Sequence, residues 1–347
     1  MKLGATTAIA VAGVTGVALA VARQYRTVAP APRELRTWQV WIPLSITGPL
    51  TLRLARRLFG PTVPVDGVDV VEHPDGGTQG VYVYRPGGSS AEGLPALLWI
   101  HGGGTILGTP EEDHELCSQL AEAAGIVVVS ARYRLAPEHP FPAAHDDCYA
   151  ALTWTRAQAT EIGVDPERIA VGGASAGGGL AAGVVQRAVN DGVPVAFQLL
   201  VYPMLDDRTT LRPASGRDHL IWSRASNRYA WTAYLGRSPV PADAPEYAVP
   251  ARRTDLAGLP PTWVGVGDLD LFLDEDVDYA RRLEAAGVPV ELVVVPDMYH
   301  AADVDLHATV PSMTRFRQQM HAAVASTLGM QQSAVTPGLD RGPGEAI

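Results

Sequence analysis

The stretch VGGASAGGG, residues 171–179, places one hydroxyl, that of Ser175, among glycines and alanines. It follows the apolar run RIAVGG, which is typical of a buried strand, and leads into the helical sequence AGGGLAAGVVQRAVN. A serine on such a sharp strand-to-helix turn needs glycine wherever a Cβ would clash, and Gly173 and Gly177 stand at those positions. The pattern G-x-S-x-G therefore predicts a turn that presents a nucleophile, although by itself it fits a packing turn equally well.

A second glycine motif, HGGG at residues 101–104, follows the apolar run ALLWIH. Three successive glycines let backbone N–H groups approach a substrate oxygen with no side chain between them. Together with the N–H of Ala176 they can form an oxyanion hole, which stabilises the negative charge that develops in acyl transfer. A plain turn rarely needs three glycines and a histidine at a strand end, so the two motifs together indicate an enzyme.

A serine hydroxyl is a weak nucleophile until a base removes its proton, so a histidine and an acid are required. His300 follows the apolar run VELVVVP on a loop at the sheet edge where Ser175 is expected, which favours it over the other histidines. The acidic segment GDLDLFLDEDVD, residues 267–278, contains Asp270 at the end of another strand sequence. Several of its other acids are expected to be solvated or to cap the next helix. The order Ser175, Asp270, His300 is the order expected for an α/β-hydrolase.

Short apolar runs alternate with helical stretches from about residue 66 onward. Near-continuous apolar runs suit strands buried on both faces of a largely parallel sheet, and helices between them imply an α/β domain. A capping box at residues 109–112 and Gly125 are expected to bound one of the helices. The predicted strands are 81–85, 96–101, 126–132, 168–173, 197–203, 262–267 and 290–296, and the other predicted helices are 143–159, 176–190, 275–286 and 311–328.

Composition excludes some functions. A chain of 347 residues with 47% apolar and 18% charged residues is long enough for one large or two modest well-cored domains. Its net charge of −10 argues against nucleic acid as a partner, because phosphate neutralisation needs a basic patch. Cys117 and Cys148 match no metal spacing and are expected to be buried free thiols. No metal or cofactor is expected.

The N-terminus has a different character from the rest of the chain. Residues 3–22 carry no charge and are long enough to cross a membrane as a helix. Lys2 and the small-x-small triplets near residue 20 also fit a signal peptide with a cleavage site. If the segment is retained, the arginines that follow it favour a cytoplasmic catalytic body. Membrane association through residues 3–22 and export with cleavage both stay open, as does a homodimer.

These motifs resemble those of the hormone-sensitive-lipase-like (bacterial family IV) esterases, which have the α/β-hydrolase fold. The resemblance extends over roughly residues 66–328. It is carried by IHGGG (100–104), ARYRLAPEHPFPAAHDD (131–147), GGASAGGG (172–179), the acid segment DLDLFLDE and MYH (298–300). It implies that Ser175 is the nucleophile, Asp270 the acid and His300 the base. The oxyanion N–H groups would come from Gly103, Gly104 and Ala176, with Gly102 in the same loop.

The resemblance also implies an activity, the hydrolysis of short- to medium-chain acyl esters by a serine carboxylesterase with a mostly parallel sheet, flanking helices and a helical cap. Three positions depart from the family pattern: Ala174 replaces a frequent aspartate, Leu271 a common proline, and Ala301-Ala302 the usual Gly-Phe. An amidase or acetyl-specific deacetylase would use the same triad. A non-catalytic binder is disfavoured because all three triad residues are present.

The segments between the motifs give a domain organisation. Residues 37–60 are strongly apolar yet carry three arginines, which predicts a pair of helices over a core or, alternatively, a flap or a membrane-surface contact. Tyr133, Arg134 and Glu138 are expected to brace the active-site edge rather than to contact substrate. The expected segments are 1–26 (membrane anchor or signal peptide), 27–65 (linker and N-terminal cap part), 66–203 (first core part), 204–250 (cap insertion), 251–329 (second core part) and 330–347 (disordered tail).

Overall fold

The structure, a computed structural model, describes residue 22 and residues 24–42, 45–58, 60–88, 91–212 and 220–329. The predicted disordered tail and nearly all of the predicted anchor or signal peptide lie outside these ranges. Within them, no helix has both the length and the apolar character that a membrane span requires.

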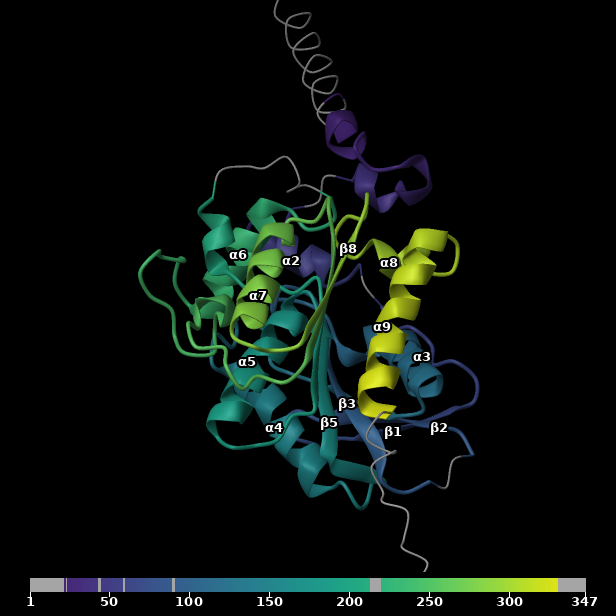
Figure 1. The fold of residues 1–347 in the computed structure, drawn as a ribbon. Coiled ribbons are helices and arrows are strands. Elements are labelled where there is room, and N and C mark those ends of the chain that lie inside the picture. The colour runs from purple at the N-terminus through teal and green to yellow at the C-terminus, as the bar shows by residue number, and fades with distance from the viewer. Residues whose placement is uncertain are drawn as a thin grey trace, which may run out of the picture.

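The centre of the described chain is one sheet of eight strands (Figure 1). Its order is β1-β2-β4-β3-β5-β6-β7-β8, with antiparallel pairing of β1 with β2 and of β2 with β4, and parallel pairing elsewhere. The strands are β1 (Val68–His73), β2 (Val81–Pro86), β3 (Leu94–Ile100), β4 (Val127–Ala131), β5 (Val164–Ala174), β6 (Phe197–Val201), β7 (Thr262–Gly267) and β8 (Val290–Val295). All the predicted strands are present, whereas β1 was not predicted.

Helices cover both faces of the sheet (Figure 1). On one face, α5 packs with Leu180 and Val184 into one apolar core, and on the other face α3 and α9 enclose a second core around Leu120 and Phe316. The helices of the domain are α3 (His114–Ala124), α4 (Ala143–Ala157), α5 (Ala176–Asn190), α7 (Leu273–Ala285), α8 (Ala302–Leu306) and α9 (Pro311–Gly329).

The helix after the HGGG loop corrects one sequence expectation. The Thr109 side chain makes no capping hydrogen bond, and Pro110–Asp113 form a 3-10 turn, so α3 begins only at His114. Its predicted end is right, because Gly125 adopts a left-handed φ of 62° there.

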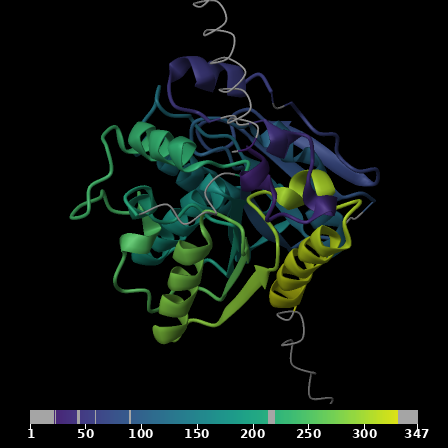
Figure 2. The same ribbon diagram turned by 90° about the horizontal axis from the view of Figure 1, so that it is seen from above.

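Two segments outside the α/β core lie in the upper half of the molecule in Figure 1, the side that faces the viewer in Figure 2. The N-terminal segment contains a 3-10 turn at Gln39–Trp41 and the short helix α2 (Pro49–Ala55), so the predicted pair of helices in residues 37–60 is only partly right. The other segment contains α6 (Arg224–Leu235). The two are joined directly, because the Ile46 N–H donates to Ser226 Oγ at 2.9 Å.

The turn between β5 and α5 depends on the absence of side chains. A Cβ on Gly177 would lie 2.0 Å from the Ile100 carbonyl oxygen and 2.4 Å from that of His101. A Cβ on Gly173 would lie 2.5 Å from the Ile100 oxygen. Both positions therefore have to be glycine for α5 to start against the end of β3.

We expect Gly177→Ala to destabilise the fold although alanine normally favours a helix by ~1 kcal/mol. The clash is with backbone that cannot move aside, and overpacking of this kind costs about 1–3 kcal/mol or more. Urea denaturation measures the difference in unfolding free energy. The control is Gly60→Ala, whose Cβ meets nothing within 4 Å. Equal stability of the two variants would contradict the packing argument.

Candidate active site

Ser175 lies at the turn between β5 and α5 in a strained backbone conformation, with φ 56° and ψ −120°. Non-glycine residues rarely adopt a positive φ, and such strain persists only where the surroundings enforce it. Here the Ser175 N–H donates to the Val201 carbonyl at 2.8 Å, and its own carbonyl accepts from the Met204 N–H at 2.9 Å. The turn thus holds the hydroxyl at the carboxyl end of the sheet, with only 7% of the residue exposed.

The predicted base and acid meet this hydroxyl. His300 Nε2 lies 2.9 Å from Ser175 Oγ, and His300 Nδ1 lies 2.8 Å from Asp270 Oδ2. The other oxygen of Asp270 accepts from the Phe272 N–H at 2.9 Å, which fixes the carboxylate. All three side chains are buried and follow the ends of β5, β7 and β8. The arrangement can pass a proton from the serine to the imidazole while the carboxylate holds the opposite ring nitrogen.

Two aromatic rings that the sequence analysis did not single out flank His300. Tyr202 and Phe272 present their rings edge-on to the imidazole, with centroid separations of 4.9 and 5.1 Å. The sequence positions of both residues could have indicated that they lie near the site, because Tyr202 follows the end of β6 and Phe272 stands two residues after Asp270. Packed in this way they fix the plane of the imidazole.

The glycine loop runs beside Ser175. A Cβ on Gly102 would lie 3.5 Å from the Ser175 Cβ, and Gly103 and Gly104 have φ values of 106° and 62°. Within the described part of the chain, the N–H groups of these three glycines donate to no protein acceptor. The Ala176 N–H, at the first position of α5, has no partner within the helix either. Gly102 and Ala176 thus lie next to Ser175, and among the described residues the N–H groups of the glycine loop and of Ala176 have no protein acceptor that would compete with a substrate oxygen.

The loop that follows β4 braces the glycine loop, as the sequence analysis expected. Tyr133 Oη lies 3.0 Å from the His101 carbonyl oxygen and 3.2 Å from that of Gly102, and its ring stacks on His101 at 4.2 Å. Burial lowers the pKa of His101 to about 4, so this imidazole is neutral. Arg134 pairs with the buried Asp147 at 2.8 Å, and Glu138 pairs with Arg56 at 2.8 Å.

Tyr133→Phe removes the hydroxyl that bonds to the glycine loop. We expect a lower kcat/KM from a looser loop, and a loss of about 1 kcal/mol in unfolding free energy, the usual net value of one hydrogen bond. Ester hydrolysis and urea denaturation measure the two effects. Tyr149→Phe is the matched control, because its hydroxyl bonds to Asp191 at the surface. The bracing role is wrong if both variants hydrolyse ester as fast as the wild type.

Several acids of the segment were expected to be solvated or to cap the helix, and two acids of α7 do neither. Glu275 is buried, accepts from the N–H groups of Leu205 and Asp206 at 2.7 and 3.1 Å, and has a pKa raised by burial to about 8. Asp276 is fully buried, and neither of its carboxylate oxygens has a hydrogen-bond partner in the described structure. Burial, followed by the charges of Glu275 and Asp270, raises the pKa of Asp276 well above its ordinary value.

This raised pKa predicts a pH dependence of stability. Asp276 ionises near pH 4 in the unfolded chain but keeps its proton to much higher pH when folded. Folding therefore takes up a proton above pH 4, so the contribution of Asp276 to stability falls as pH rises. We expect Asp276→Asn to gain in melting temperature relative to the wild type between pH 5 and pH 8.

Thermal melts of both proteins across this range measure the gain. Asp278→Asn is the matched control, because the Asp278 side chain is 63% exposed. If the difference in melting temperature between Asp276→Asn and the wild type does not change with pH, Asp276 ionises alike in the folded and unfolded states.

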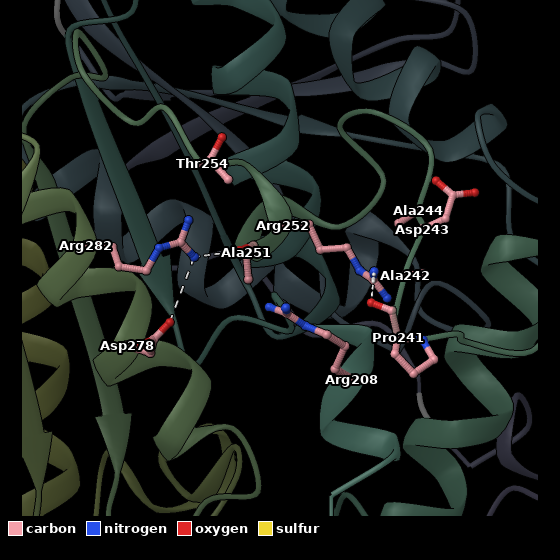
Figure 3. A pocket seen from close by; sticks show the side chains of 10 residues that line it. All are labelled: Arg208, Pro241, Ala242, Asp243, Ala244, Ala251, Arg252, Thr254, Asp278 and Arg282. Atoms are coloured by element: carbon pink, nitrogen blue, oxygen red, sulfur yellow. Dashed lines mark hydrogen bonds and ion pairs between the residues drawn. The ribbon is translucent and has the colours of Figure 1, made fainter.

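A pocket of about 630 Å³ lies elsewhere, between the segment around residue 242 and α7 (Figure 3). Three guanidinium groups line it, but each is held by protein acceptors. Arg252 makes two bonds to Asp207 and Arg208 two to Asp206, while Arg282 donates to the Ala251 carbonyl. The pocket shares no lining residue with the Ser175 site.

A family model described as the α/β-hydrolase fold matches residues 97–303, a span that contains Ser175, Asp270, His300 and the glycine loop. The chain belongs to the α/β-hydrolase fold family. The predicted fold class is thereby confirmed, and the relatives described next confirm the resemblance to esterases of this fold. The cap segments 27–65 and 204–250 lie mostly outside the core motifs, and their assignment as a cap stays a prediction.

Relatives of this α/β-hydrolase carry esterase names. It is 37% identical over 255 residues to Esterase LipI of Mycobacterium tuberculosis, which covers 71% of this chain and 78% of the relative. It is 35% identical over 231 residues to the ethyl acetate hydrolase of Pseudomonas putida, covering 65% of this chain and 72% of the relative. Among solved structures, a bacterial heroin esterase has a TM-score of 0.80 at 38% identity, covering 87% of this chain and 99% of that one.

Proposed function

We propose that this α/β-hydrolase is a serine carboxylesterase that works through an acyl-enzyme on Ser175. The observation that carries the proposal is the continuous chain of contacts from Ser175 Oγ through His300 to Asp270, at 2.9 and 2.8 Å. The esterase names of its relatives support the reaction type.

The reaction has two halves. Ser175 Oγ attacks the ester carbonyl carbon while His300 Nε2 takes the hydroxyl proton, and Asp270 stabilises the imidazolium that forms. The oxyanion accepts hydrogen bonds from the N–H groups of Gly103, Gly104 and Ala176, with Gly102 in the same loop. His300 then gives its proton to the departing alcohol. In the second half, His300 deprotonates water, the water attacks the acyl carbon, and the proton returns to Ser175 as the carboxylic acid leaves.

Short- to medium-chain acyl groups are the proposed substrates. The ring of Trp222 lies over the glycine loop, since a Cβ on Gly104 would be 2.4 Å from it. A bulky ring beside the proposed oxyanion site supports a shorter rather than a longer acyl chain. The names of the ethyl acetate hydrolase and the heroin esterase, both of which denote esters of small acids, support the same range.

Hydrolysis of p-nitrophenyl acetate, butyrate, octanoate and palmitate tests both points. We expect the highest kcat/KM on the shorter chains, and a loss of about 10³- to 10⁶-fold in kcat for Ser175→Ala and His300→Ala, because the triad acts as a unit. Ser312→Ala, in the first turn of α9, and His73→Ala, at the end of the edge strand β1, are matched controls. A Ser175→Ala variant that keeps its rate would exclude the mechanism, whereas activity on p-nitroanilides alone would change the substrate class to amides.

A further inference from the structure

The N-terminal segment exposes a group of large apolar side chains, which we term the outer cap face. Exposed apolar side chains usually occur singly, so the concentration of six of them within residues 38–58 points to an interaction surface. Leu50 is 80% exposed and Trp38 is 69% exposed. The face consists of Trp38, Trp41, Ile42, Leu50, Leu54 and Leu58.

Helix α2 carries apolar side chains on two sides, and only one of these sides packs against the core. Its Leu52 and Ala55 are buried against the core. On the opposite side, Leu50 and Leu54 stand one turn apart and are turned to solvent. Leu58, in the turn that follows α2, is exposed as well. Arg53 and Arg57 are also exposed and stand beside these leucines in the sequence. Exposed leucines interleaved with arginines are typical of helices that lie in the interface of a membrane.

The charge of this segment is opposite to that of the whole chain. Residues 24–58 contain six arginines and a single acid, Glu34, although the protein has a net charge of −10. Arg36 and Arg56 are partly turned inward, since they donate to the Ala31 carbonyl and to Glu138. The exposed arginines of the segment are Arg26, Arg33, Arg53 and Arg57.

The segment that carries the outer cap face is hydrogen-bonded to two loops of the candidate active site. Tyr299, the neighbour of His300, donates its hydroxyl to the Leu35 carbonyl at 2.8 Å. On the other side, Arg56 donates through Nε to the Ile106 carbonyl, just past the glycine loop, at 2.8 Å. Figures 1 and 2 show that α2 and residues 24–42 lie toward the same end of the molecule as α8, which directly follows the His300 loop.

We propose that the outer cap face docks onto the surface of an anionic lipid bilayer. Such a surface accepts leucine and tryptophan side chains at the level of the headgroups and attracts arginines, at about 1 kcal/mol for each. The sequence that leads into residue 24 agrees with this partner, because residues 3–22 carry no charge. The docking does not depend on the esterase assignment. If that assignment also holds, the site opens toward esters dissolved in the bilayer.

A fluorescent probe on the face itself tests the proposal in the full-length protein. Cys117 and Cys148 are fully buried, so an environment-sensitive thiol label attaches selectively to an introduced cysteine. Leu54→Cys places the label on the outer cap face. Thr160→Cys is the control, because Thr160 is exposed just before β5, at the opposite end of the sheet. Both are mixed with vesicles of phosphatidylcholine and phosphatidylglycerol, and with vesicles of phosphatidylcholine alone, and co-sedimentation is measured in parallel.

We expect a blue shift of the label at residue 54 with the anionic vesicles and none at residue 160. Arg53→Gln and Arg57→Gln are then added to the Leu54→Cys protein. We expect these two changes to raise the lipid concentration that gives half of the shift by about 30-fold, the effect of two interfacial arginines. Three results would overturn the proposal. One is the absence of co-sedimentation, and another is co-sedimentation with the residue 54 label still in water. The third is a label already shifted without vesicles in a protein that elutes as a dimer, which would make a second copy the occupant.

Discussion

The candidate site depends on one close approach, that of the β5–α5 turn to the end of β3. Because Gly173 and Gly177 carry no Cβ, the turn packs directly against the carbonyl oxygens of Ile100 and His101. The glycine loop starts at the next residue, so a single backbone contact sets the distance between the proposed nucleophile and the proposed oxyanion donors. Strain in the Ser175 backbone is a consequence of the same packing.

The other residues of the site are placed near this contact by the neighbouring parallel strands. Asp270 and His300 follow the ends of β7 and β8, and the rings of Tyr202 and Phe272 fix the imidazole between them. Burial of the three polar side chains strengthens each hydrogen bond, because the surroundings screen charge less than water does. The same burial makes an unpaired acid costly, and Asp276 responds by keeping its proton.

The sequence alone predicted the strands of the parallel sheet and the meeting of Ser175, Asp270 and His300, because both follow from local patterns. Buried parallel strands are continuous apolar runs, and their loops necessarily meet at one edge. It did not predict β1, since this edge strand alternates polar and apolar residues and has no buried residue. The capping box at Thr109 was overridden by a 3-10 turn. The burial of Glu275 and Asp276 depends on which face of α7 meets the β6 loop, and that is set by tertiary packing.

The hydrogen bond from Tyr299 to the Leu35 carbonyl limits how many N-terminal residues can be removed before the His300 loop loses support. The first side chain of the described segment that bonds to another part of it is Gln24, which donates to the Val40 carbonyl. Proteolytic trimming at the small residues near position 22 would spare these bonds, so the His300 loop would keep its support. Trimming beyond Leu35 would instead leave the buried Tyr299 hydroxyl without an acceptor next to the proposed base. Residues 24–35 are in this sense a structural part of the hydrolase.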